Sequence, residues 1–193
     1  AEFGRGLGPA DWSAIRFTVL QAALSALLST MLAIPVARAL ARRRFVGRGL
    51  LVTLLGAPFI LPVIVAVLGV LAVFGRAGWL NAVLAHVFFN LPLATRLLLQ
   101  AWQTVPAERF RLAAQLDLTP RAVFRSIELP LLRQILPGTP ALIFVICLTS
   151  FAVALTLGGG PRATTIELAI YQAFRFDFDL NRAALLSLVQ LGL

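Results

Sequence analysis

The sequence predicts an all-α protein, a polytopic bundle of transmembrane helices. Of its 193 residues, 60% are hydrophobic and 13% are charged, and the mean hydropathy is +0.91. Soluble domains average about a quarter charged residues, and a core of this size cannot hide so much apolar surface. Apolar runs long enough to cross a membrane alternate with short polar segments. These observations together predict an integral membrane protein.

All 17 basic residues are arginines, and the formal net charge is +9. The pI of about 11.7 would suggest a nucleic-acid partner in a soluble protein. Here most arginines lie beside apolar spans, which is the positive-inside distribution of membrane proteins, so no nucleic acid is expected as a partner. Because the chain has no lysine, it cannot form a conventional P-loop ATPase site, which needs that residue on the phosphates.

A single cysteine, Cys147, lies inside an apolar run, so an internal disulfide is excluded and a buried, inert thiol is expected. The chain has one histidine, His86. One cysteine and one histidine cannot build a zinc site without other chains. We therefore expect no metal site and no cofactor.

Five apolar segments are expected to enter the membrane, where a hydrocarbon core about 30 Å thick needs about 20 helical residues. They cover residues 15–37, 50–74, 82–99, 135–157 and 183–193. The last segment is too short to cross alone, so the C-terminus is expected to be truncated. Residues 1–11 lack the pattern of a signal peptide, and the chain is expected to begin partway into a longer protein.

Two prolines, Pro58 and Pro62, interrupt the second apolar segment. A proline removes a backbone donor from the helix. The result is either a discontinuous helix of the kind that lines substrate paths in transporters or a simple kink, and the sequence leaves both open.

The distribution of arginines predicts the orientation in the membrane. Ten arginines fall on the side that holds residues 38–48 and 103–134, and five fall on the other side. The positive-inside rule therefore places residues 103–134 in the cytoplasm.

Residues 103–134 form a polar island between two apolar segments, and two short helices are expected there. The first has an apolar side that includes Phe110 and Ala113. Thr119 can cap the second helix, and Pro120 suits its first position. The pair would form a knob that a soluble partner can receive. The alternative is a solvated loop that merely joins two spans.

Polar residues inside or beside the spans are candidates for a substrate pathway. His86 and Asn90 are four residues apart and share one face of a helix. Buried polar groups in a bundle often mark a pathway, but an interhelical hydrogen bond is the favoured reading. Glu167 belongs to a weakly acidic outer segment. Asp179, in the same segment, is expected to cap the fifth span.

The second part of the polar island resembles the cytoplasmic coupling loop, or EAA loop, of ABC-importer permeases. The match is anchored on Pro120, Phe124 and the pair Leu129-Pro130. It sets Asp117 at the family's glycine position and residues 111–113 at its Glu-Ala-Ala. The implied contacts with an ATPase are at Glu108, Phe110, Arg111, Leu112, Ala113, Ala114, Asp117, Pro120, Phe124, Leu129 and Pro130. Phe110, Ala113 and Ala114 are expected to face the partner, with Leu116 turned toward the membrane side.

Further blocks at 84–92, 150–161 and 163–172 closely resemble the first half of the bacterial thiamine ABC transporter permease. The resemblance implies a bundle of the type I ABC-importer permease kind. Residues 1–193 would form one partial permease domain, the first repeat of a longer protein. Such a subunit has no catalytic residues of its own. Its implied partners are separate ABC ATPase subunits, a periplasmic substrate-binding protein, the second permease half and the lipid bilayer of the bacterial inner membrane, which it crosses several times.

Two departures and two alternatives accompany this resemblance. The family's earlier N-terminal span and second half are expected to lie outside these 193 residues, and the connection near Asn81 is shorter than the family's. A permease for ferric iron or another small cation shares the architecture. An intramembrane enzyme would need a nucleophile held next to a base, but no G-x-S-x-G motif occurs.

Overall fold

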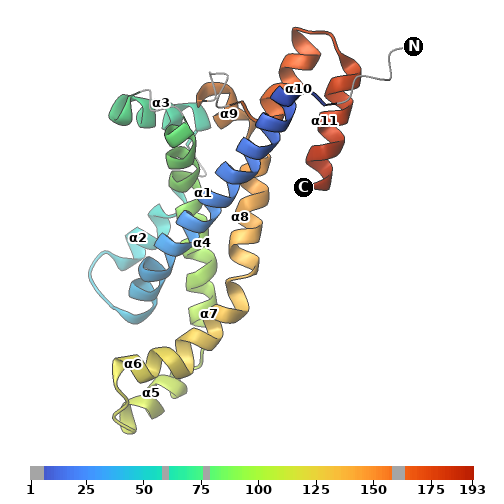
Figure 1. The fold of residues 1–193 in the computed structure, drawn as a ribbon. Coiled ribbons are helices and arrows are strands. Elements are labelled where there is room, and N and C mark those ends of the chain that lie inside the picture. Colours follow the sequence, from blue (N-terminus) through green and yellow to red (C-terminus); the bar gives the residue numbers. More distant parts are fainter. Residues whose placement is uncertain (1–6, 58–60, 76–78, 158–163) are drawn as a thin grey trace. The chain divides into compact units, whose positions relative to one another are not determined.

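The computed structural model describes residues 7–57, 61–75, 79–157 and 164–193, and within these residues every regular element is a helix (Figure 1). This confirms the all-α prediction. The elements are α1 (Pro9–Arg42), α2 (Arg48–Leu54), α3 (Val63–Phe74), α4 (Trp79–Gln103), α5 (Ala107–Gln115), α6 (Pro120–Val123), the π-helix η2 (Phe124–Glu128), α7 (Leu129–Ile135), α8 (Gly138–Leu148), α9 (Phe151–Leu157), α10 (Ile166–Arg175) and α11 (Leu180–Gly192).

Three helical segments of the described chain are long and apolar enough to cross a membrane. They are Pro9–Arg42, Trp79–Gln103 and Pro120–Leu148. The first two contain the predicted spans 15–37 and 82–99 and extend them at both ends, because polar residues continue a helix beyond its apolar part.

The structure divides the predicted span 50–74 into α2 and α3, which is one of the two alternatives that the sequence left open. Pro62 lies immediately before α3, at its N-cap. Proline is favoured at the start of a helix, where no intrahelical donor is needed, and disfavoured in its interior, where it removes a hydrogen bond. The interruption is therefore a discontinuity rather than a kink. Pro58 lies outside the described residues.

The predicted span 135–157 has wrong limits at both ends. Its helix begins earlier, within the polar island, and α8 ends at Leu148. The Thr149 hydroxyl donates to the carbonyls of Val145 and Ile146, at 3.2 and 3.3 Å. It thereby satisfies carbonyls of the last helical turn, as helix ends require. The glycine block at 158–161 lies outside the described residues.

Helix α10 lies in a stretch for which no helix was predicted. Thr165 caps it, because its hydroxyl accepts from the backbone N–H of Leu168 at 3.3 Å. Asp179 caps α11 by accepting from the N–H of Arg182 at 3.0 Å, which confirms the predicted cap.

The chain groups into two compact units, each described separately below. Unit 1 consists of the described parts of Ala1–Ser25, Leu61–Val87 and Phe144–Leu193, and unit 2 of those of Ala26–Ile60 and Phe88–Ile143. In unit 1, Val67, Ala82, Ala85 and Val153 form one buried cluster that joins α3, α4 and α9. Small residues at such contacts let helix backbones approach closely. A single permease domain over residues 1–193 stays a prediction.

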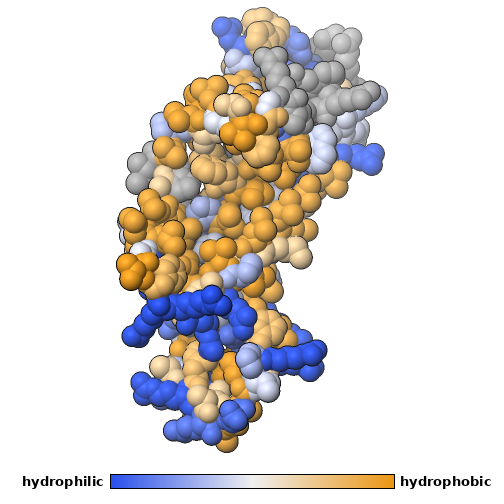
Figure 2. All heavy atoms as spheres, turned by 90° about the vertical axis from the view of Figure 1, so that its left-hand side faces the viewer, coloured by the Kyte–Doolittle hydropathy of each residue, from blue (hydrophilic) through white to orange (hydrophobic). Residues whose placement is uncertain are grey.

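Helix α1 has an apolar outer side and a polar buried side. Its exposed side chains include Leu20, Leu27 and Met31, and its buried ones include Thr18, Gln21, Ser25, Ser29 and Thr30. This reverses the pattern of a helix on a soluble protein. It suits a helix whose outer side contacts lipid and whose polar side faces other helices. Figure 2 shows apolar side chains over much of one face, with hydrophilic side chains gathered near the end that holds α5 and α6.

Candidate functional site

The polar island folds into α5 and α6 within unit 2. The first short helix is as predicted, but the helix that begins with α6 continues through η2 and α7 instead of ending as a second short helix. The Thr119 hydroxyl accepts from the backbone N–H of Ala122 at 3.3 Å, and Pro120 occupies the first helical position. The sequence identified this helix start correctly because a cap is a local interaction.

An ion pair joins α1 to this island. Arg38 Nε lies 2.6 Å from Glu128 Oε2, and Arg42 Nε lies 3.7 Å from Glu128 Oε1. The Glu128 side chain is 0% exposed, whereas the two arginine side chains are 41% and 38% exposed. A buried carboxylate needs such cationic partners to offset the loss of its hydration.

Each arginine also covers an aromatic ring of the island. The Arg38 guanidinium carbon lies 5.4 Å from the ring centroid of Phe124 in η2. That of Arg42 lies 4.3 Å from the ring centroid of Phe110 in α5. Both distances are in the range of cation–π attraction. The end of α1 contacts both α5 and η2 through five residues, which we call the arginine clamp: Arg38, Arg42, Phe110, Phe124 and Glu128.

The π-helix η2 carries two residues of the clamp, Phe124 and Glu128. The backbone N–H of Leu129 bonds the carbonyl of Phe124, five residues earlier. Pro130 follows at once, and a proline ring clashes with the carbonyl four residues before it in a regular α-helix. The wider turn therefore accommodates Pro130. Such turns are frequent at functional sites.

The exposed face of the island differs from the expected one. Ala113 is only 4% exposed, whereas Leu116 is 70% exposed. The predictions that Ala113 faces a partner and that Leu116 faces the membrane side were therefore wrong. Leu118 and Leu112 are exposed as well. The reason is that Ala113 packs inside unit 2 and Leu116 follows the last turn of α5. We call Leu112, Leu116 and Leu118 the leucine face.

Asp117 adopts a left-handed backbone conformation, with a φ of 49°. Its N–H bonds the carbonyl of Ala114 at 3.2 Å and closes the turn after α5. Glycine populates this region without strain, and aspartate is among the residues that tolerate it. The position that the resemblance assigned to glycine is thus one that requires a positive φ.

The remaining predicted coupling residues differ in exposure. Exposed ones are Glu108, Arg111, Leu112, Ala114, Asp117, Pro120 and Pro130, and partly buried ones are Phe110, Phe124 and Leu129. The prediction missed Arg38, Arg42 and Glu128. A lone carboxylate in the apolar stretch 127–132, opposite an arginine-rich helix end, was the available signal. An open groove of about 560 Å³ lies beside the clamp, lined by Ile34, Pro35, Arg38, Ala39, Arg42, Arg43 and Phe124.

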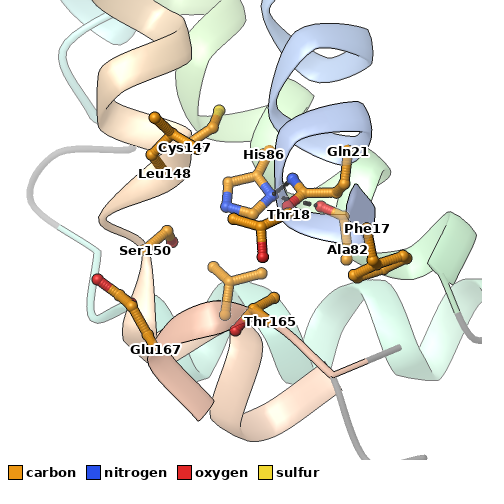
Figure 3. Close-up of a pocket in the computed structure, with 11 residues that line it drawn as sticks. Phe17, Thr18, Gln21, Ala82, His86, Cys147, Leu148, Ser150, Thr165 and Glu167 are labelled. Atoms are coloured by element: carbon orange, nitrogen blue, oxygen red, sulfur yellow. Dashed lines mark hydrogen bonds between the residues drawn. The ribbon is translucent and has the colours of Figure 1, made fainter. Parts of the chain in front are cut away.

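A second candidate site is a small cavity in unit 1, lined by both polar and apolar side chains (Figure 3). Gln21 Nε2 lies 2.6 Å from His86 Nδ1, which also lies 2.8 Å from the Ala82 carbonyl. These two contacts need opposite proton placements on Nδ1, since a protonated nitrogen donates to the carbonyl and an unprotonated one accepts from the amide. The contact with Gln21 of α1 confirms the interhelical hydrogen bond expected for His86.

The cavity brings together two of the three predicted pathway residues. His86 and Glu167 both line it, whereas Asn90 is buried in unit 2. Glu167 Oε1 accepts from Gln190 Nε2 at 3.0 Å. Burial raises the pKa of the Glu167 carboxyl, and this hydrogen bond opposes the rise. The prediction missed Gln21, although an amide in an apolar span was a visible signal.

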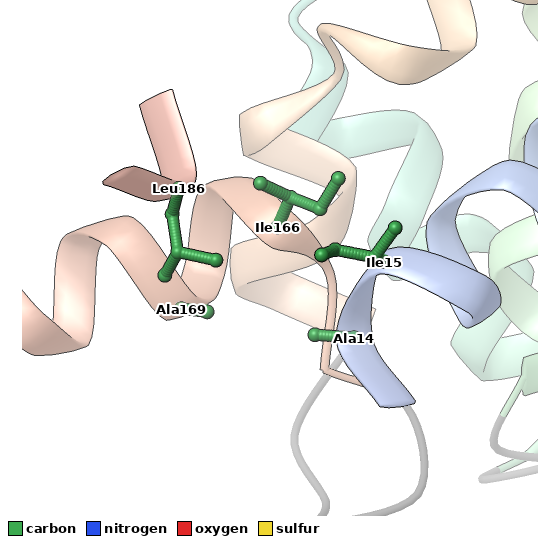
Figure 4. Packing of buried hydrophobic residues seen from close by; sticks show 5 residues of the cluster. All are labelled: Ala14, Ile15, Ile166, Ala169 and Leu186. Atoms are coloured by element: carbon green, nitrogen blue, oxygen red, sulfur yellow. The ribbon is translucent and has the colours of Figure 1, made fainter. Parts of the chain in front are cut away.

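The cavity has a volume of about 10 Å³, which is close to the room that one water molecule needs. In this conformation the cavity therefore cannot hold an organic substrate. Elsewhere in unit 1, a buried apolar cluster joins three helices, where Ala14 and Ile15 of α1 meet Ile166 and Ala169 of α10 and Leu186 of α11 (Figure 4).

Comparison with known proteins gives the following relatives. No family model matches the chain. It is 52% identical over 199 residues to the thiamine transport system permease protein ThiP of Escherichia coli (strain K12), covering 93% of this chain and 37% of that protein. It is 30% identical over 201 residues to the molybdenum transport system permease protein ModB of Mycobacterium bovis, covering 94% of this chain and 75% of that protein.

A solved structure has a similar fold. It is the crystal structure of a bacterial ABC transporter involved in the import of the acidic polysaccharide alginate, matched with a TM-score of 0.74 at 18% identity, over 96% of this chain and 76% of that chain. The likeness confirms the permease fold that the sequence resemblance implied. The chain spans just over a third of the length of the ThiP relatives that it matches.

Proposed function

This chain belongs to the family of transport-system permease proteins, and on that premise we propose that it is part of the membrane-spanning subunit of an ATP-driven importer of thiamine. It is a membrane protein, and we place it in the bacterial inner membrane with several crossings. The observation that carries the coupling part of this proposal is the island of α5, α6 and η2, which presents an exposed leucine face and is bound to the end of α1.

The leucine face fits a soluble protein partner better than lipid. Leu112, Leu116 and Leu118 stand among exposed charged residues such as Glu108 and Arg111. Apolar side chains rimmed by charge are typical of protein interfaces. We assign this surface to a separate ABC ATPase chain, which would hydrolyse ATP, since the present sequence lacks the lysine of a P-loop.

The proposed transport cycle needs further chains. Closure of two ATPase subunits would displace the coupling residues at 108–130 and thereby rock the helices between outward-open and inward-open states. A periplasmic binding protein would deliver the substrate from outside, and a second permease half would complete the pathway. We propose that three residues line that pathway: His86, Asn90 and Glu167. In another state of the transport cycle, the pathway would be wider than the small cavity seen in the present conformation.

The choice of thiamine as the substrate rests on the identity of about half the aligned residues with a protein named for thiamine transport, against 30% with one named for molybdenum transport. The test is uptake of labelled thiamine by cells that lack their own thiamine transporter and express the full-length protein with its ATPase and binding protein. We expect ATP-dependent uptake that excess unlabelled thiamine abolishes. Uptake of ferric iron without thiamine uptake would overturn the substrate assignment.

A further inference from the structure

We propose that the arginine clamp makes the end of α1 and the coupling helices move as one lever, with Glu128 as the positioning residue that holds them together. This inference rests on the proposed function, because a lever needs an ATPase to drive it. It adds a physical path from the partner surface to a membrane-spanning helix.

The clamp connects three elements through one pair of side chains. Arg38 contacts η2 twice, through Glu128 and Phe124, and Arg42 contacts both η2 and α5, through Glu128 and Phe110. Arg42 over Phe110 holds α5 to α1 directly, and the other three contacts hold η2 to α1. A displacement of α5 and η2 together against α1 would therefore have to break all four contacts at the same time. All five residues belong to unit 2, so the lever is complete within one compact body.

The burial of Glu128 makes these contacts strong. Its carboxylate is 0% exposed, and moving it away from both arginines would leave an ionised group without a cation in a poorly hydrated place. Breaking a buried pair in this way is far less favourable than separating a surface pair. The contacts of Glu128 with Arg38 and Arg42 should therefore stay intact while the ATPase displaces the coupling helices.

The clamp lies between the exposed leucine face and the membrane-length part of α1. Arg38 and Arg42 lie one helical turn apart in the last two turns of α1, which then runs back as an apolar, membrane-length helix. The leucine face lies on α5 and the turn after it, on side chains that the clamp leaves exposed. A push on the leucine face would thus reach α1 directly through Phe110 and Arg42, and through η2 by way of Glu128 and both arginines.

The experiment measures whether the coupling helices keep their distance from α1 during the cycle. Spin labels are attached in the full-length protein, complexed with its ATPase subunits, at Val36 of α1 and Arg109 of α5, both exposed. Distances are recorded without nucleotide and with ATP in a hydrolysis-deficient ATPase. We expect the same narrow distance in both states. A shift of several ångströms between the states would overturn the lever.

The variants Glu128→Gln and Arg42→Gln test the clamp itself, and Arg44→Gln is the control because it removes a neighbouring exposed arginine outside the clamp. We expect both clamp variants to broaden the distance distribution and to lower thiamine uptake per ATP hydrolysed several-fold. Co-purification of the ATPase should be retained. Arg42→Gln keeps the 2.6 Å pair of Arg38 and Glu128, so it remains informative if Glu128→Gln fails to fold.

The two proposals fail in different ways. If the unsubstituted protein does not co-purify with the ATPase, both the proposed function and the lever are overturned. If it co-purifies and transports, but the clamp variants match Arg44→Gln in distance and in uptake per ATP, only the lever is overturned.

Discussion

Single residues in the coupling island illustrate how one side chain or one dihedral angle decides a local structure. Glu128 is the clearest case, because a fully buried carboxylate organises two arginines that are themselves partly exposed. Asp117 is another, because the turn after α5 depends on its left-handed backbone. The sequence resemblance pointed to Asp117, but only the φ value explains why a glycine belongs there.

Asp117→Gly is expected to leave transport intact and to leave stability unchanged or slightly raised, because glycine adopts a φ of 49° without strain. Asp117→Val should destabilise the full-length protein by about 1–2 kcal/mol, because a β-branched side chain is strained in the left-handed conformation that aspartate tolerates. The midpoint of thermal unfolding in detergent measures both. Equal midpoints for the valine and glycine variants would contradict the assigned conformation.

Leu116→Asp is the appropriate test of the partner surface, because Leu116 is 70% exposed. We expect a normal protein level, loss of ATPase co-purification and loss of uptake, since a charge buried without a partner at an interface costs several kcal/mol. Gln115→Asp, an exposed neighbour outside the leucine face, is the matched control. If the Leu116→Asp variant still co-purifies with the ATPase, the leucine face is not part of the interface.

The substitution Ala113→Asp would not test the partner surface. Ala113 is 4% exposed within the protein itself, so an aspartate there would place a carboxylate in the interior of unit 2. The expected result is a reduced protein level, which pulse labelling of the membrane fraction would detect. Normal levels of this variant would show that Ala113 is more accessible than the structure indicates.

At the scale of elements, caps and interruptions decide where each helix begins and ends. Thr119, Thr165 and Asp179 each accept a backbone N–H at a helix start. Pro62 and Pro130 produce two different outcomes, since the first begins α3 and the second follows a π-turn within a continuing helix. The context of each proline, rather than its presence, determines the outcome.

Thr119→Ala should loosen the start of α6 by about 1 kcal/mol, the typical cost of removing a threonine cap. Hydrogen exchange at the amides of residues 121–123 measures the change, and faster exchange is expected there. Ser126→Ala is the control, because the Ser126 hydroxyl bonds the Ala122 carbonyl at 2.7 Å and caps no helix start. The same acceleration in both variants would show that the Thr119 cap does not stabilise α6.

At the scale of the whole molecule, the arginine distribution leads to a prediction about topology. A reporter fused after Arg44 or Arg121 should be cytoplasmic, and one fused after Arg175 should be periplasmic, because ten arginines flank the spans on the first side and five on the other. Alkaline phosphatase and green fluorescent protein fusions report the two sides. A periplasmic signal at Arg121 would contradict the coupling-island assignment, because ATPase subunits are cytoplasmic.

The sequence by itself determined the class of protein, the helical content and several helix starts. Hydropathy is a property of consecutive residues, and a membrane requires every spanning backbone group to bond within its own helix. Caps such as Thr119 and Asp179 act over three residues. These features could be predicted because the interactions behind them are local.

Only the tertiary structure decided which distant residues meet and which side of each helix is buried. Arg38 pairs with Glu128 across 90 residues, Gln21 with His86 across 65, and Asp11 with Arg182 across 171. The buried side of α5 and the break after Leu148 were likewise not predicted. The physical reason is that burial and ion pairing depend on neighbours supplied by other elements, which neither hydropathy nor local spacing specifies.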